Sequence, residues 1–100
     1  MFGKLTAKPG YRDALLSILL EASHAVAQVE GCRLYVVNTS PDEPDSVYIY
    51  EAWDTAKTHA ASLELEETRA AIHRAMPLLA GPPENGITLT PVGGLGLDAG

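Results

Sequence analysis

Residues 32–53, which read CRLYVVNTSPDEPDSVYIYEAW, give the strongest indication of the fold. Residues 32–39 and 47–53 are rich in β-branched and aromatic side chains, which favour strands. The segment between them, residues 40–45, is dense in turn-forming Pro, Asp and Ser. The sequence therefore predicts that the two strands pair as an antiparallel hairpin.

Both strands of this hairpin are apolar on both faces. In the first strand, Leu34 and Val36 point to one face, and Tyr35 and Val37 point to the other. The second strand repeats this pattern. Such strands require cover on both faces of their sheet, and one layer of helices covers only one face. We therefore predict that a second copy of the chain covers the other face, which makes the protein a homodimer through its sheet.

The segments on either side of the hairpin predict the rest of the fold. Residues 2–8 form a first strand, and an apolar stripe predicts a helix from Tyr11 to about Val29, which Gly31 ends. After the hairpin, Asp54 or Thr55 caps the next helix. The remaining expected elements are that helix over residues 56–62, a longer helix that starts near Glu64 and is kinked or ended at Pro77, a strand over residues 87–90 and an arm over residues 91–97.

The order strand, helix, strand, strand, helix, strand is typical of the ferredoxin-like, or split βαβ, arrangement. We predict an α+β fold in one domain over residues 1–100, with an antiparallel sheet and its helices on one face. The apolar stripes of the two long helices are expected in the core. They contain Tyr11, Ala14, Leu15, Ile18, Leu19, Ala22 and Val26 in the first helix, and Leu65, Thr68, Ile72, Met76 and Leu79 in the second.

The composition excludes several classes of protein. The chain has 100 residues, of which 46% are hydrophobic, so it suits one folded core and not a disordered chain. Its formal net charge of −6 disfavours nucleic acid and anionic membranes as partners. The single cysteine, Cys32, excludes an internal disulfide and favours a reducing, cytoplasmic setting. No apolar run is long enough to span a bilayer.

Candidate chemistry gathers at the end of the second hairpin strand. Trp53 is the only tryptophan, and it suits either a core anchor or the wall of a pocket for a flat aromatic ligand. His59 shares a helical face with Ser62, so it is either a general base or a capping or surface residue. Glu51 points to the same face as Trp53, and a carboxylate on an apolar face needs a partner.

Arg33 and Arg69 are the candidate partners of Glu51, and a structural ion pair is the simpler interpretation of such a contact. No metal ion is expected, because the three histidines and the scattered carboxylates lack the spacing of metal ligands.

Four further side chains are candidates for the substrate-binding site. Three of them are open to two interpretations. Tyr35 and Asn38 either supply hydrogen bonds or pack at the interface, and His73 either lines a cavity or faces solvent. Tyr50 stands next to Glu51 and is expected among the substrate-binding residues.

Five short motifs resemble a known family. Residues 30–37, EGCRLYVV, resemble the E-G-C-x-x-Y entry to the second strand of the antibiotic biosynthesis monooxygenase family. Residues 50–55, YEAWDT, are similar to the E-x-W ending of its third strand. Residues 59–63, 77–81 and 91–94, which read HAASL, PLLAG and PVGG, resemble a quinol monooxygenase subgroup of this family. The motifs follow one another in order along nearly the whole chain.

The resemblance implies a dimeric ferredoxin-like fold in which two sheets meet in a barrel-like core, with a pocket between each sheet and its own helices. It implies oxygenation of a quinol or polycyclic phenol by O2 without metal, flavin or haem, starting from loss of the phenolic proton. By the same resemblance Trp53 lines the pocket, His59 is a polar pocket residue and Arg69 supplies a basic group. Tyr48 and Ile49 stand where some relatives carry an asparagine.

We therefore expect a cofactor-independent monooxygenase in which Trp53 packs on the substrate ring, His59 takes or orients the phenolic proton, and Arg69 or Tyr35 stabilises the oxyanion. The alternative is a non-catalytic dimer that binds a small aromatic ligand or has only a structural role. Haem degradation is disfavoured, because the first strand lacks the required asparagine and Leu63 lies near the expected histidine position. The expected substrate-binding residues are Tyr35, Asn38, Tyr50, Glu51, Ser62 and His73.

Overall fold

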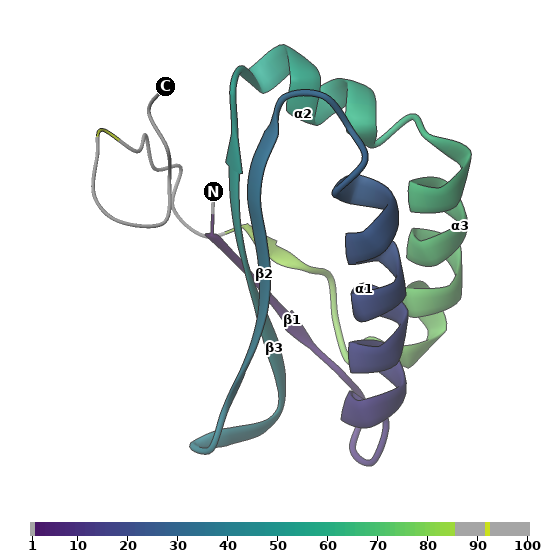
Figure 1. The fold of residues 1–100 in the computed structure, drawn as a ribbon. Coiled ribbons are helices and arrows are strands. Elements are labelled where there is room, and N and C mark those ends of the chain that lie inside the picture. Colours follow the sequence, from purple (N-terminus) through teal and green to yellow (C-terminus); the bar gives the residue numbers. More distant parts are fainter. Residues whose placement is uncertain (1, 86–91, 93–100) are drawn as a thin grey trace.

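The structure is a computed structural model that describes residues 2–85 and residue 92. Its strands and helices follow the predicted order (Figure 1). They are β1 (Phe2–Thr6), α1 (Arg12–Val26), β2 (Cys32–Ser40), β3 (Glu43–Trp53), α2 (Ala56–Ser62), α3 (Glu66–Ala75), the short 3-10 helix η1 (Met76–Leu78) and β4 (Glu84–Asn85).

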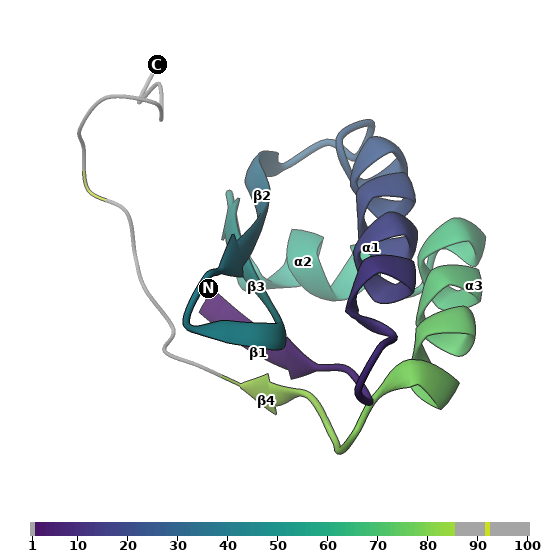
Figure 2. The same cartoon turned by 90° about the horizontal axis from the view of Figure 1, so that it is seen from below.

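The four strands form one antiparallel sheet in the order β2-β3-β1-β4. Helices α1 and α3 lie side by side on the same face of this sheet (Figures 1 and 2). We refer to that face as the helix face and to the opposite one as the open face. The predicted α+β, ferredoxin-like arrangement with helices on one face is confirmed.

The core lies between α1 and the helix face of β3. Leu15 and Val47 are fully buried there, because the helical stripe of α1 meets every second residue of the strand. Tyr11 and Ala14 were expected in this stripe, but both are exposed. The helix begins only at Arg12, so Tyr11 precedes it and Ala14 belongs to its first turn. The remaining members of the core cluster are Ala7, Ile18, Leu19, Ile49, Ala75 and Leu79.

The hairpin is longer than the sequence predicts. Ser40 pairs with Glu43, so only Pro41 and Asp42 connect the strands, and the expected turn over residues 40–45 is wrong. The start of β3 is held in place by contacts with β1 and with its own strand. Lys4 Nζ lies 2.8 Å from Glu43 Oε2, and the Tyr48 hydroxyl donates to the same carboxylate.

The second helical stripe is buried only in part. Thr68 and Leu79 are buried as expected, whereas Ile72 and Met76 are 47% and 54% exposed. The helix ends at Ala75, and Pro77 lies in the 3-10 turn that follows, which confirms the predicted break.

The chain after α3 returns to the sheet beside β1. Glu84 pairs with Lys4, so the last strand begins earlier than predicted. The expected strand over residues 87–90 and the arm over residues 91–97 lie outside the described residues, apart from Val92.

Gly31 fixes the start of β2 against the first turn of α2. Its φ of +96° lies in the left-handed region, and a Cβ built there would stand 2.8 Å from Thr58 Cβ. Thr58 belongs to the cap of α2, because its backbone N–H donates to Thr55 Oγ1 at 3.1 Å. The Gly31 carbonyl accepts a hydrogen bond from the Asp54 N–H at 2.7 Å. Thr55 is thus the cap of α2, one of the two predicted candidates. Thr58, in the first turn of this helix, leaves no room for a side chain at residue 31.

We expect Gly31→Ala to lower the free energy of unfolding by about 2 kcal/mol or more, because it adds a steric contact to the cost of a left-handed alanine. Gly10→Ala is the matched control. Gly10 has a φ of +86° but nothing within 4 Å of its built Cβ, so it should lose only about 1 kcal/mol. Urea unfolding of both variants measures the difference. Equal losses would contradict the proposed contact with Thr58.

Candidate active site

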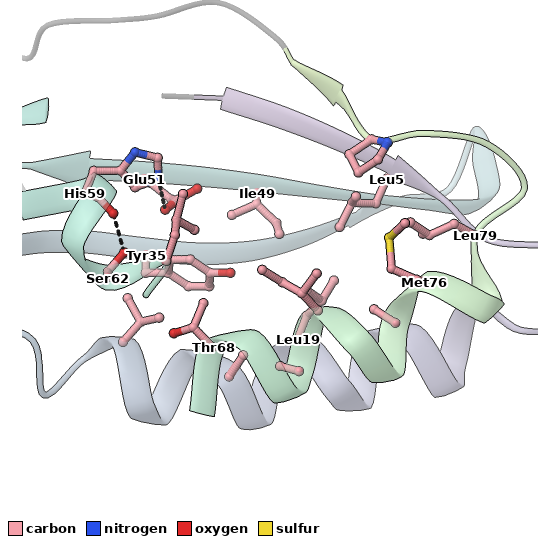
Figure 3. A pocket seen from close by; sticks show the side chains of 17 residues that line it. Leu5, Leu19, Tyr35, Ile49, Glu51, His59, Ser62, Thr68, Met76 and Leu79 are labelled. Atoms are coloured by element: carbon pink, nitrogen blue, oxygen red, sulfur yellow. Dashed lines mark hydrogen bonds and ion pairs between the residues drawn. The ribbon is translucent and has the colours of Figure 1, made fainter. Parts of the chain in front are cut away.

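A cavity of about 270 Å³ lies between the helix face of the sheet and the three helices (Figure 3). Most of the side chains that line it are apolar. Ile49 comes from β3, Leu19 from α1, and Ala75 from α3. The half-exposed Ile72 and Met76 also line the cavity, which explains why the second helical stripe is not fully buried.

The polar lining residues lie together at one end of the cavity, as Figure 3 shows. Glu51 is the carboxylate of this group. Its Oε1 accepts a hydrogen bond from Trp53 Nε1 at 3.1 Å and lies 3.5 Å from His59 Nε2. The side chains of Glu51 and His59 are only 15% and 20% exposed, so this pair is largely shielded from solvent. The other polar members are Tyr35, Ser62 and Thr68.

The local sequence explains how His59 reaches Glu51. Strand β3 alternates its side chains, so Glu51 follows Ile49 onto the helix face. The Thr55 cap then starts α2, and the last turn of that short helix brings the His59 ring to 5.4 Å from the Trp53 ring, tilted by 48°. Ser62 Oγ donates to the His59 carbonyl at 2.6 Å. The predicted shared face of His59 and Ser62 is thus seen in the structure.

Tyr35 points its hydroxyl into the cavity from β2 (Figure 3). Burial raises the pKa of this phenol above its usual value of 10.0, and the negative charge of Glu51 raises it further. Tyr35 is therefore a neutral hydrogen-bond donor at neutral pH.

Thr68 lines the same end of the cavity, and its hydroxyl is buried. The residue is 8% exposed, and its Oγ1 has no hydrogen-bond partner among the described residues. A buried hydroxyl without a partner is costly and requires an explanation. The sequence carried one signal for it, since Thr68 is the polar member of an apolar helical stripe.

The structure brings together only part of the predicted site. Tyr35, Glu51, His59 and Ser62 all line the cavity. Trp53 is not one of the lining residues. Its indole N–H donates to Glu51, and its ring lies beside that of His59.

Four predicted site residues lie elsewhere. Arg69 and His73 are exposed on α3 and do not line the cavity. Asn38 is exposed and donates to the carbonyls of Val36 and Tyr48. Tyr50 alternates with the lining residues of β3 and so lies on the open face.

The partner of Glu51 within the cavity was missed by the sequence reasoning, which considered only arginines. His59 provides that contact, while Arg33 forms an ion pair with Asp54. The spacing of eight residues gave no obvious sign of this pair, because Glu51 lies in a strand and His59 lies in the helix that follows it.

Within residues 2–85, no group of three or more His, Cys, Asp or Glu side chains lies close enough to hold a metal ion. Among the helices of the same described part, none has the length and apolar character needed to cross a membrane.

The raised pKa of Tyr35 predicts a loss of stability at high pH. Above pH 10 the unfolded chain releases the Tyr35 proton and the folded chain keeps it, so the free energy of unfolding falls as pH rises. This group alone contributes a slope of at most about 1.4 kcal/mol per pH unit. Urea midpoints between pH 9 and pH 12 should fall less steeply in Tyr35→Phe than in the unaltered protein. The same slope in both proteins would contradict the burial of this hydroxyl.

The sequence model of the family described as antibiotic biosynthesis monooxygenase matches residues 1–74. A crystal structure from Chloroflexus aurantiacus J-10-fl, whose protein carries the same family name, is 39% identical in sequence. The match covers 97% of this chain and 95% of that one, with a TM-score of 0.81.

Two more distant structures share the fold. A protein of the same family name from Nitrosomonas europaea is 19% identical over 90% of each chain, with a TM-score of 0.80. The protein Rv0793 from Mycobacterium tuberculosis is 19% identical over 94% of each chain, also with a TM-score of 0.80. No curated protein matches the chain significantly.

Proposed function

This chain belongs to the antibiotic biosynthesis monooxygenase family, and we propose that it is a cofactor-independent monooxygenase that oxidises a quinol or polycyclic phenol with O2. The observation that carries the proposal is the shielded pair of Glu51 and His59 at one end of an apolar cavity. The cavity volume lies just below the usual range of ligand pockets, which suits two or three fused rings.

The polar end of the cavity supplies the groups that the first step needs. The substrate hydroxyl donates to the Glu51–His59 pair, and its proton passes to His59, whose imidazolium is stabilised by the Glu51 carboxylate. The Tyr35 hydroxyl donates to the phenolate oxygen that remains. The apolar walls exclude water and leave the anion poorly solvated, which favours its oxidation.

The later steps involve the substrate and O2. The phenolate gives one electron to O2, and the resulting phenoxyl radical and superoxide combine to form a carbon–oxygen bond. The peroxide anion that results takes the proton back from His59 and becomes a hydroperoxide. Loss of water from the hydroperoxide then leaves a carbonyl at the oxygenated carbon. One oxygen atom of O2 stays in the product, and the other leaves as water together with two hydrogens of the substrate.

Trp53 is a positioning residue in this proposal. Its indole N–H holds Glu51 from outside the cavity, and its ring packs beside that of His59. This role replaces the expected packing of Trp53 against the substrate. Arg69 receives no role, because its side chain is exposed on α3.

Oxygen uptake by metal-stripped protein tests the activity, with hydroquinones, naphthohydroquinones and anthrones as substrates and protein-free blanks for autoxidation. We expect His59→Ala to lower the enzymatic rate by roughly 10²–10⁴-fold, the usual contribution of a general base. His73→Ala is the matched control, since that histidine is exposed outside the cavity and its loss should leave the rate unchanged.

Two outcomes would contradict the proposal. A rate that disappears on metal removal would exclude the cofactor-free reaction, and an unchanged rate in His59→Ala would exclude the assigned proton transfer. Binding of these compounds without oxygen uptake would favour the non-catalytic ligand-binding alternative.

We also propose that the open face of the sheet is covered by a second copy of the chain. This face carries apolar and aromatic side chains, including Val36, which is 39% exposed, and the stacked rings of Phe2 and Tyr48 at 5.8 Å. Apolar and aromatic side chains that remain accessible on a sheet face are typical of an interface between protein chains.

Light scattering at micromolar concentration tests the dimer. We expect twice the chain mass for the unaltered protein, and the monomer mass of 10.6 kDa for Val36→Asp, because burying an unpaired charge at an interface is costly. Leu20→Asp introduces the same charge at an exposed leucine of α1, away from the open face, and should remain dimeric. A mass of 10.6 kDa for the unaltered protein would contradict the proposal.

A further inference from the structure

We propose that the cavity opens to solvent past Ile72 and Met76, and that this opening binds an aliphatic chain carried by the ring inside the cavity. The inference rests on the proposed function, because it takes the hydroxyl of the ring to face Glu51 and His59. It adds to the substrate class an alkyl substituent that points away from the hydroxyl. Its test measures binding and requires no turnover.

The two ends of the cavity carry different side chains. Figure 3 shows Tyr35, Glu51 and His59 at one end, and Met76 and Leu79 at the other. We refer to these regions as the polar end and the apolar end. A ring whose hydroxyl donates to Glu51 therefore directs a substituent on its far side toward the apolar end.

Two large apolar side chains border both the cavity and the solvent. Ile72 and Met76 are 47% and 54% exposed, and both line the cavity. They are four residues apart, so they lie next to each other at the end of α3. Pro83, which precedes β4, is a third exposed lining residue. We refer to these three residues as the mouth of the cavity, and Met76 places the mouth at the apolar end.

The chemistry of the mouth suits an aliphatic chain. Among the described residues that line the cavity, the ionisable ones are Tyr35, Glu51 and His59, and all three lie at the polar end. The mouth therefore offers apolar contacts and no charged side chain. A methylene chain has no polar group to leave unpaired there, and it removes its own apolar surface and that of Ile72 and Met76 from water.

The size and position of the cavity also favour such an occupant. A volume of about 270 Å³ is filled by two or three fused rings, so a longer substituent must pass through the mouth. Helix α3 lies on the helix face of the sheet (Figure 2). A second copy of the chain on the open face therefore leaves Ile72 and Met76 uncovered.

A series of 4-alkylphenols tests the inference by calorimetric titration without oxygen. The probes are 4-ethylphenol, 4-butylphenol and 4-hexylphenol, in which the chain lies opposite the hydroxyl. A fully buried methylene strengthens binding about fourfold, and one in a half-exposed mouth about twofold. We therefore expect 4-hexylphenol to bind at least about tenfold more tightly than 4-ethylphenol. Equal or weaker binding of 4-hexylphenol would overturn the inference.

Two variants locate the chain in the mouth. Met76→Gln and Ile72→Gln each keep a side chain of similar size and replace an apolar contact by a polar amide. Each should lower the preference for 4-hexylphenol over 4-ethylphenol by at least about threefold, and change the affinity for 4-ethylphenol less than about twofold. Circular dichroism checks that each variant folds, and either folded variant suffices. An unchanged preference in the folded variants would overturn the inference.

Leu20→Gln is the matched control, because Leu20 is a 47% exposed leucine of α1 that does not line the cavity. It should leave the preference unchanged, and an equal loss there would contradict a specific mouth. The results also separate the inference from the proposed function. A preference for long chains without oxygen uptake supports the mouth and contradicts the activity, whereas oxygen uptake with quinols and no preference for long chains does the reverse.

Discussion

The packing of α1 against every second residue of β3 positions both the core and the candidate site. Leu15 and Val47 are fully buried at its centre, and Ile49 extends the contact along the strand. The same alternation then carries Glu51 onto the helix face, at the polar end of the cavity that the helices leave there. The core and the candidate site are therefore consecutive parts of one strand face.

A carboxylate under the helices is costly unless it is paired, and the chain meets this requirement with neighbours in sequence. Trp53 ends the same strand, Thr55 caps α2, and His59 lies in the last turn of that helix. Gly31 allows β2 to approach this cap closely. Because these residues lie close together along the chain, the geometry around Glu51 is set mostly by local structure, and the remaining cavity walls are supplied by distant elements.

The positions that the sequence misjudged have a common physical cause. Arg69 was placed in the site by the family resemblance, and His73 was expected either to line a cavity or to face solvent, but Thr68 and Ala75 are the buried residues of α3. Asn38 and Tyr50 belong to strands that are apolar on both faces, so their pattern did not show which face the helices cover. Trp53 was correctly placed near the site, yet its contacts are with Glu51 and His59 and not with the cavity.

The order of the elements, the two-sided hairpin, the two candidate caps of α2 and the shared face of His59 and Ser62 could be predicted from the sequence, since each depends on the spacing of near neighbours. The sequence also carried the motifs of the family. The packing of distant elements was needed to show which sheet face the helices cover, that His59 pairs with Glu51, and that the buried Thr68 hydroxyl has no partner among residues 2–85. These features depend on how α2 and α3 are placed over β3, and the packing of the whole chain sets that placement.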